Sequence, residues 1–258
     1  MVMTMPDLDS FQIKRSKRCH HYAYVFHSPV STHMVYQERA FDSYDSVFCV
    51  GPHHVREIRA REALIGSRPK KLVEHGYCRL DEMIAVCPKR PEDENKKLFH
   101  VIIAPSWGSS GIFETFGKKL VQVLLDNGFR VSARVHPQTV RLNASVIEEM
   151  RNEFSGHDFF ELELDLTDMS TLVASDLMIS DWSGAAFDYA MGLQKPVIFL
   201  DTPYKVNNVD FEKLGITPVE ISIRESLGCV MGAESLDRLP EIIRRLITDV
   251  GHLKKNIV

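Results

Sequence analysis

The chain has 258 residues, of which 44% are hydrophobic, 26% charged and 9% aromatic. These are the proportions of an ordinary folded protein, and they exclude a disordered tail, a collagen-like fibre and a small disulfide-stapled domain. The formal net charge of -4 argues against a general nucleic-acid coat, which needs a basic excess. No apolar run reaches the ~20 residues of a membrane span.

Two further features concern the compartment. The five cysteines are odd in number and show no C-x-x-C spacing, which predicts reduced thiols. The first residues, Met-Val-Met-Thr-Met-Pro-Asp, lack the charged and apolar regions of a signal peptide. We therefore expect a cytoplasmic protein.

The first ninety residues predict a small α/β domain. A helix is expected over His53 to Leu64. The segments with strand character are Val2 to Met5, Tyr22 to Phe26, Ser46 to Val50 and Lys71 to Glu74. Because a complete doubly wound domain normally has more strands, we expect residues 1–90 to form a partial domain.

The clearest shift in composition is the segment Pro88 to Lys97, which has two prolines, seven charges and no apolar side chain. Such a segment is typical of a linker or an exposed loop. It predicts a domain boundary, with the second domain over residues 91–258.

Strands and helices alternate after this linker. Expected strands are Phe99 to Ala104, Phe129 to Val135, Phe159 to Leu164, Leu177 to Ser180 and Val197 to Leu200. Expected helices are Phe113 to Asp126, Val140 to Phe154, Met169 to Ala174, Ala185 to Leu193 and a last one from Pro240 to about residue 249. This alternation with short links predicts an α/β fold with a parallel sheet covered on both faces.

Ligands of such sheets bind beyond the carboxyl ends of the strands, so the segments that follow strands are the candidate sites. Ser180-Asp181-Trp182-Ser183-Gly184 lies between a strand and a helix, where helix N–H groups and the positive dipole end favour phosphate. The alternative to phosphate binding, given equal weight, is that Ser183 caps the helix and Asp181 holds the turn together.

Two other segments that follow strands carry side chains suited to binding a phosphate. Ser106, Trp107 and Gly108 lie in a small-residue loop, although it is neither a P-loop nor a dinucleotide fingerprint. Arg134 and His136 share one face of the preceding strand, so a guanidinium and an imidazole can point toward one ligand. The alternatives are a structural loop, a surface arginine and a histidine bonded to backbone.

In the amino-terminal part, His27 ends an apolar strand and is a candidate base, although a single histidine there is more often structural. Adjacent histidines, as in His20-His21 and His53-His54, do not converge on one ion, so we expect neither a metal site nor a cofactor. The basic run Lys14 to Arg18 suits a solvated edge, or else contact with an anionic polymer or lipid headgroups.

These segments together resemble the CDP-glycerol glycerophosphotransferase family, over about residues 20 to 205. The segments that carry the resemblance are His27-Ser-Pro29, Phe41-Asp-Ser-Tyr-Asp45, Glu74-His-Gly-Tyr-Cys-Arg-Leu-Asp81, Ala104-Pro-Ser-Trp-Gly108, Arg134-Val-His-Pro137 and Ser180-Asp-Trp-Ser-Gly184. The resemblance implies a GT-B fold, with two Rossmann-like domains, and synthesis of teichoic-acid-like polymers at the inner membrane face.

The resemblance also implies roles. His27 stands where the family has the histidine of Trp-His-Gly-Thr, its proposed general base, although Phe26 and Ser28-Pro29 depart from that motif. Arg134 and His136 match Arg-x-His-Pro, which contacts the nucleotide diphosphate. Ser180, Asp181 and Ser183 match Ser-Asp-Tyr-Ser-Ser, with Trp182 for tyrosine and Gly184 for the second serine.

The expected reaction is attack of an acceptor hydroxyl on the β-phosphorus of CDP-glycerol or another CDP-polyol, with release of CMP. His27 and His136 would be catalytic, and the acceptor would be a polyol-phosphate polymer or lipid-linked primer, with peripheral membrane contact. One alternative is a GT-B glycosyltransferase or epimerase that uses a UDP-sugar. The other is a non-catalytic, truncated nucleotide-binding relative, because the first domain has few strands.

Overall fold

The computed structural model describes residues 1–87 and 98–248, so the predicted linker over residues 88–97 lies outside the described residues. The chain forms two compact units, one of Met1–Cys78 with Lys205–Ile223, the other of Arg79–Tyr204 with Arg224–Val258. The boundary expected at residue 90 stays a prediction. Residues 205–223, which we expected in the second domain, belong by their contacts to the first unit.

The first unit is built on a four-stranded parallel sheet in the order β1-β2-β3-β4. Its strands are β1 (Val2–Met3), β2 (Ala23–Val25), β3 (Ser46–Cys49) and β4 (Lys71–Glu74). The four predicted strands are thus confirmed, three of them shorter than expected. Helix α1 (Pro52–Ile65) begins with a proline and ends at Gly66 in a left-handed conformation, as helix-end chemistry favours.

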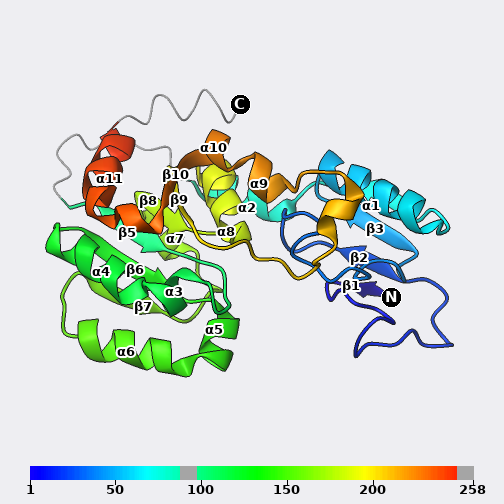
Figure 1. Cartoon of the computed structure of the whole chain (residues 1–258), viewed down its shortest axis with the longest axis horizontal. Helices are drawn as coiled ribbons and strands as arrows, with labels where there is room; N and C mark the ends of the chain where they lie inside the picture. Colours follow the sequence, from blue (N-terminus) through cyan, green and yellow to red (C-terminus); the bar gives the residue numbers. More distant parts are fainter. Residues whose placement is uncertain (88–97, 249–258) are drawn as a thin grey trace. The chain divides into compact units, whose positions relative to one another are not determined.

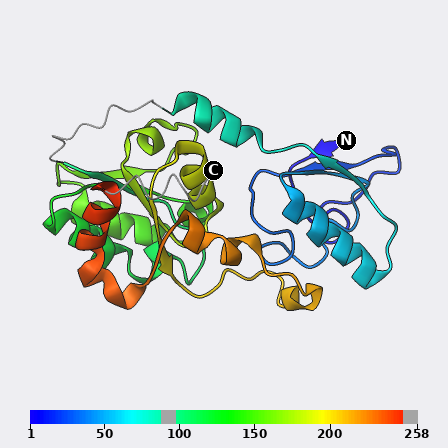
Figure 2. The same cartoon turned by 90° about the horizontal axis from the view of Figure 1, so that it is seen from above.

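Residues 205–223 add two short helices, η2 (Phe211–Leu214) and α9 (Val219–Ser222), to this unit. Helix η2 lies beside α1 (Figure 2). The core of the unit is aromatic, and it includes Tyr22, Tyr24, Phe26, Phe41 and Tyr44. Burial raises the pKa of the Tyr44 hydroxyl to about 12, so this tyrosine stays neutral.

The second unit contains a six-stranded sheet in the order β10-β9-β8-β5-β6-β7, and all neighbouring strands are parallel. The strands are β5 (His100–Ile103), β6 (Arg130–Arg134), β7 (Phe160–Glu163), β8 (Leu177–Ser180), β9 (Val197–Asp201) and β10 (Gly228–Gly232). Strands β5 and β8 lie side by side although β6 and β7 come between them in sequence. This is the order of a doubly wound sheet, and its topological switch point lies between β5 and β8.

The helices of the second unit follow the expected alternation but are more broken. They are α2 (Cys78–Val86), α3 (Ile112–Thr115), α4 (Gly117–Asp126), α5 (Pro137–Leu142), α6 (Ala144–Phe154), α7 (Ser170–Ala174), α8 (Gly184–Phe187), the π-helical η1 (Asp188–Gly192), α10 (Arg224–Leu227), η3 (Ala233–Arg238) and α11 (Leu239–Thr248). The two long helices expected over 113–126 and 140–154 are each divided, because Phe116 (φ -143°) and Asn143 (φ -135°) leave helical geometry. We did not predict α2, α10 or β10.

One face of the six-stranded sheet is covered by α4, α6 and α11, which share a continuous apolar core with it. Helices α2 and α8 lie on the opposite side from α4 and α6 (Figure 1). Strands β5 and β8 are buried along their whole length, as expected of central strands in a sheet covered on both faces. The parallel α/β fold predicted from the sequence is confirmed.

Candidate functional site

The loops after β5 and β8 are held together at the switch point of the second unit. The backbone N–H of Ser106 donates to Oδ1 of Asp181 at 2.7 Å, and Oγ of Ser180 donates to the carbonyl of Ala104 at 2.7 Å. The Ser106, Asp181 and Ser180 side chains are buried, with at most 6% exposed. These three predicted binding residues therefore form the framework that joins the two loops.

Glycines allow the loop after β5 to turn tightly. Gly108 has φ +125°, a backbone conformation that residues with a Cβ rarely adopt. A Cβ on Gly111 would lie 2.5 Å from Oε2 of Glu114 and 3.1 Å from the Ser106 carbonyl oxygen. The loop therefore turns back onto the amino end of α3, and Gly108 and Trp107 remain half-buried at its tip.

His136 precedes α5 as its N-cap residue. Its Nδ1 accepts a hydrogen bond from the N–H of Gln138 at 3.1 Å, so Nε2 carries the proton of the neutral ring. The imidazole lies 6.1 Å from the ring of Trp107 between centroids, with an angle of 35° between the planes. The structure thus brings together the predicted residues of the loops after β5 and β6.

Arg134 is placed differently from our expectation. Strand β6 ends at Arg134, so strand alternation does not decide the direction of His136, and the shared face stays a prediction. The Arg134 guanidinium is buried, forms an ion pair with Glu163 of β7, and donates to the carbonyls of Leu166 and Asp168. Burial lowers the pKa of Arg134 and raises that of Glu163, so desolvation outweighs their mutual attraction.

Ser183 and Gly184 begin α8, and both are half-buried. The Ser183 hydroxyl oxygen accepts from the N–H of Ala185 at 3.3 Å, which is the capping contact considered from the sequence. Its own hydroxyl proton is not used by that contact. Helices α3, α5 and α8 are the first helices after β5, β6 and β8, and eight, two and three residues separate them from the carboxyl ends of these strands. Three amino-terminal helix ends there favour an anion.

Arg224 is a residue near this site that sequence reasoning missed. Its buried guanidinium lies 3.8 Å from the ring centroid of Trp182 and pairs with Asp201 at 3.0 Å. The Trp182 indole N–H donates to the carbonyl of Thr202 at 2.9 Å, which fixes the loop after β8 to the end of β9. No local motif marks Arg224, because 42 residues separate it from Trp182 in sequence.

His27 lies in the first unit, and the residues above all lie in the second. His27 follows Phe26 directly after β2, its side chain is exposed, and its carbonyl accepts from the Tyr77 hydroxyl at 3.1 Å. Tyr77 belongs to the segment Glu74 to Asp81 that carried part of the resemblance. The end of β2 and the loop after β4 are therefore joined at His27.

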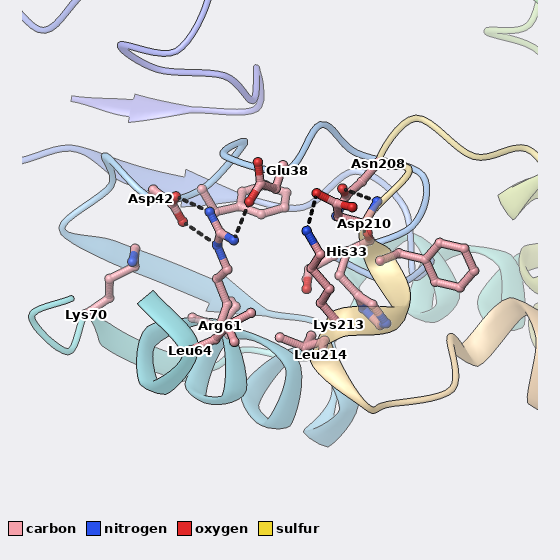
Figure 3. A pocket seen from close by; sticks show the side chains of 14 residues that line it. His33, Glu38, Asp42, Arg61, Leu64, Lys70, Asn208, Asp210, Lys213 and Leu214 are labelled. Atoms are coloured by element: carbon pink, nitrogen blue, oxygen red, sulfur yellow. Dashed lines mark hydrogen bonds and ion pairs between the residues drawn. The ribbon is translucent and has the colours of Figure 1, made fainter. Parts of the chain in front are cut away.

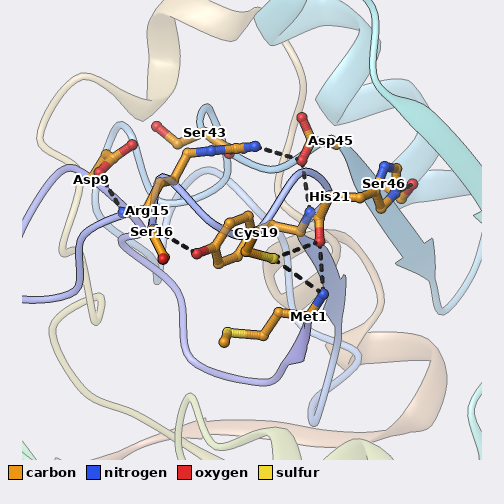
Figure 4. Close-up of polar contacts among 10 residues, drawn as sticks. Met1, Asp9, Arg15, Ser16, Cys19, His21, Ser43, Asp45 and Ser46 are labelled. Atoms are coloured by element: carbon orange, nitrogen blue, oxygen red, sulfur yellow. Dashed lines mark hydrogen bonds and ion pairs between the residues drawn. The ribbon is translucent and has the colours of Figure 1, made fainter.

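The other histidines and the basic run have structural contacts. His53 and His54 bond to the carbonyls of Pro29 and Val30, at 2.9 and 2.8 Å. Over residues 1–87 and 98–248 no group of three or more His, Cys, Asp or Glu side chains is arranged to hold a metal ion. Arg15 pairs with Asp45 at 2.8 Å (Figure 4), so the basic run is partly bound to its own domain.

All five cysteines are free thiols. In the part of the chain that the structure describes, no helix is long and apolar enough to cross a membrane.

A small cavity lies in the first unit between α1, η2 and the loop over residues 32–42 (Figure 3). Its volume is about 40 Å³, room for roughly three water molecules and far below that of a nucleotide site. The charged groups at its rim are already paired: Arg61 donates to Glu38 and Asp42, and Lys213 pairs with Asp210. At this volume the cavity is too small for a nucleotide.

Comparison with solved structures shows the fold. A protein assigned as a UDP-N-acetylglucosamine 2-epimerase from Listeria monocytogenes matches with a TM-score of 0.55 and 15% identity, over 92% of this chain and 62% of that chain. S. aureus MnaA in a structure with UDP matches with a TM-score of 0.52 and 16% identity, over 92% and 61%. The wall teichoic acid polymerase TagF, in a structure with CDPG, matches with a TM-score of 0.45 and 15% identity, over 93% and 63%.

The chain thus spans a little over 60% of the length of these solved structures. No curated protein sequence matches it significantly. The CDP-glycerol:poly(glycerophosphate) glycerophosphotransferase family matches residues 27–205, which is more than half of the chain and includes every predicted site residue. The chain therefore belongs to the CDP-glycerol:poly(glycerophosphate) glycerophosphotransferase family.

Proposed function

We propose that this protein transfers a glycerol-phosphate unit, or a similar polyol-phosphate unit, from a CDP-polyol to a hydroxyl of a growing cell-surface polymer. The observation that carries the proposal is the Ser106–Asp181 hydrogen bond of 2.7 Å, which joins the loops after β5 and β8 at the switch point of the sheet. Family membership over residues 27–205 supports the same reaction class.

On the donor side, the half-buried groups are the ones that can reach a diphosphate: Trp107, Gly108, His136, Ser183 and Gly184. His136 carries a proton on Nε2, Ser183 has its hydroxyl proton, and the amino ends of α3, α5 and α8 carry backbone N–H groups. Such donors neutralise phosphate oxygens, and phosphoryl transfer needs positioning and neutralisation more than covalent chemistry.

The buried residues have a supporting part in this proposal. Asp181 and Ser180 hold the two loops together, and Arg134 holds the segment after β7 through the carbonyls of Leu166 and Asp168. Contact of Arg134 with the diphosphate, implied by the family motif, requires its guanidinium to leave Glu163. We assign Arg134 to the donor site as a proposal on that condition.

In the reaction, the acceptor hydroxyl oxygen forms a bond to the β-phosphorus of the CDP-polyol. The bond between that phosphorus and the bridging oxygen breaks, and CMP leaves with the negative charge. His27 takes the proton of the acceptor hydroxyl, and His136 stabilises charge on the leaving CMP. Histidine is the side chain most often used as a general base, and the His27 side chain is exposed at the end of a strand.

The acceptor in this proposal is a polyol-phosphate polymer or a lipid-linked primer, which brings the protein to the inner face of the membrane. The exposed side chains of Lys17 and Arg18 support contact with anionic headgroups there. Arg15 does not take part, because Asp45 already pairs with it.

The test is release of CMP from CDP-glycerol by the purified chain with a glycerol-phosphate primer. A His136→Ala variant is expected to lose most of this activity, and full activity would refute its role. CDP-ribitol, UDP-N-acetylglucosamine and UDP are compared by thermal shift, because a ligand that binds the folded state stabilises it. Preference for the uridine ligands would favour the epimerase-type alternative, and CDP-glycerol binding without CMP release would favour a non-catalytic relative.

A further inference from the structure

The loop that follows His27 is held along its whole length by polar groups, and those at its centre are buried. Residues 29–35 accept or donate hydrogen bonds one after another, and their partners come from α1 and from residues 205–223. All of these contacts lie within the first unit. A surface loop would normally bond to water instead.

Two glutamates bind the centre of this loop. Glu220 of α9 accepts from the backbone N–H of Ser31 at 2.9 Å and from its hydroxyl at 2.7 Å. Glu57 of α1 accepts from the backbone N–H of Thr32 at 2.6 Å and from its hydroxyl at 2.8 Å. Both carboxyl side chains are buried, Glu57 with 1% and Glu220 with 0% exposed.

His33 connects the two partner segments. Its Nδ1 lies 3.4 Å from Oε2 of Glu57, and its Nε2 lies 3.0 Å from the carbonyl oxygen of Ile216. Burial opposes a charged ring, but Glu57 raises the pKa of His33, and the His33 and Thr32 contacts lower that of Glu57 despite its burial. Burial raises the pKa of Glu220.

The ends of the loop are held as well. His53 and His54 bind the carbonyls of Pro29 and Val30, and the backbone N–H groups of Asn207 and Asn208 bind the carbonyl of Met34 at 2.9 and 3.2 Å. On its amino side, His27 follows the buried Phe26, and its carbonyl is bound by Tyr77. Only Ser28 lies between the bound carbonyl of His27 and the bound carbonyl of Pro29.

Burying two carboxyl groups costs free energy that an apolar loop contact would not, and a bonded polar network specifies one conformation. Both oxygens of Glu220 are bonded to Ser31, whereas on Glu57 only Oε2 is bonded, to Thr32. We propose that Glu57 and Glu220 are positioning residues, which fix the backbone at Thr32 and Ser31 and thereby set the direction of the His27 imidazole. This inference rests on the proposed function, in which His27 receives the proton of the acceptor.

The test uses Glu220 because two variants separate charge from geometry. Glu220→Gln keeps one oxygen that can accept from the Ser31 N–H and one amide that can donate to the Ser31 hydroxyl. Glu220→Ala removes both contacts. The matched control is Glu212→Ala, an exposed glutamate of the same segment.

Two measurements are made on the full chain: hydrogen–deuterium exchange of residues 29–35, and kcat and KM for CDP-glycerol. For Glu220→Ala we expect faster exchange in this loop and a kcat lower by about 100-fold, the typical effect of a catalytic group displaced by about 1 Å. KM is expected to stay within about twofold, because the donor residues lie in the other unit. Glu220→Gln and Glu212→Ala are expected to resemble the wild type.

An unchanged kcat in Glu220→Ala, or equal loss in the alanine and glutamine variants, would overturn the proposal. If Glu220→Ala does not fold, Ser31→Ala and Thr32→Val each remove one hydroxyl contact and should lower kcat by about tenfold; unchanged kcat in both would overturn it. A wild-type chain that releases no CMP refutes the proposed function instead. In that case exchange alone decides whether Glu220 holds the loop, and unchanged exchange in Glu220→Ala overturns that as well.

Discussion

Asp181→Ala tests whether the two loops at the switch point depend on one carboxylate. In the structure, Oδ1 of Asp181 accepts the backbone N–H of Ser106 at 2.7 Å, and the two residues are 1% and 6% exposed. Alanine leaves this buried N–H without its acceptor. Losing a hydrogen bond to a charged group costs about 1.5–3 kcal/mol, because water cannot replace the missing partner.

A loss of about 2 kcal/mol corresponds to a decrease in melting temperature of about 4–8 °C for a protein of this size. The same change frees the loop that carries Trp107 and Gly108, so the KM for CDP-glycerol is expected to rise about tenfold, equivalent to about 1.4 kcal/mol. Asp181→Asn keeps an oxygen at the Oδ1 position and is expected to lose less than half as much in both measurements.

The assays are thermal unfolding followed by circular dichroism, and CMP release over a range of CDP-glycerol concentrations. Asp158→Ala is the control, because Asp158 is exposed and follows α6 on the surface. If Asp181→Ala matched Asp158→Ala in both melting temperature and KM, the Ser106–Asp181 contact would not organise the donor site.

Three further predictions concern other parts of the chain. Burial lowers the pKa of His54 to about 4 from its ordinary 6.5. Between these values the unfolded chain binds a proton that the folded chain does not, so the stability falls as the pH falls through that window. This group contributes about 3 kcal/mol to the fall, and urea unfolding of His54→Gln should show a shallower dependence on pH. The two tryptophans both lie in the candidate site loops, so each single variant keeps one fluorophore. CDP-glycerol should change the fluorescence of Trp182→Phe, which keeps the half-buried Trp107 beside His136, but not that of Trp107→Phe, which keeps Trp182 with 4% exposed. Equal responses would contradict this. Lys195→Met should lower the free energy of unfolding by about 3 kcal/mol in urea titrations, because the buried ammonium donates to the carbonyls of Leu172, Val173 and Ser175. Lys213 is exposed, so Lys213→Met should leave the free energy of unfolding almost unchanged.

Local pattern was sufficient for every strand except β10, and for the polar residues that follow the strands. Buried parallel strands such as Val101-Ile-Ile103 are short apolar runs that no helix period explains, and the polar residues directly after them are visible in the sequence. Helix breaks were less visible. The break lies at Phe116, next to Gly117, where an added Cβ would lie 3.0 Å from the ring of Phe113, and propensity alone gave no sign of it.

Partners distant in sequence could not be predicted. Arg134 had a guanidinium suited to phosphate, but the register of β6 and β7 places it opposite Glu163, which takes the ion pair. Ser180 and Asp181 had groups suited to a ligand, but the adjacency of β5 and β8 directs them to Ala104 and Ser106. In each case the chemistry of the side chain was readable and its partner was not.

The sequence by itself thus determined that the chain is a parallel α/β protein of ordinary composition, with its polar groups after the strands. Tertiary structure decided which of these groups are buried and used to hold the loops. It also decided that residues 205–223 join the first unit, where Glu220 binds Ser31 across 189 positions of sequence. The physical reason is that periodicity and propensity are local, whereas a buried polar group must find its partner wherever the fold brings one within about 3 Å.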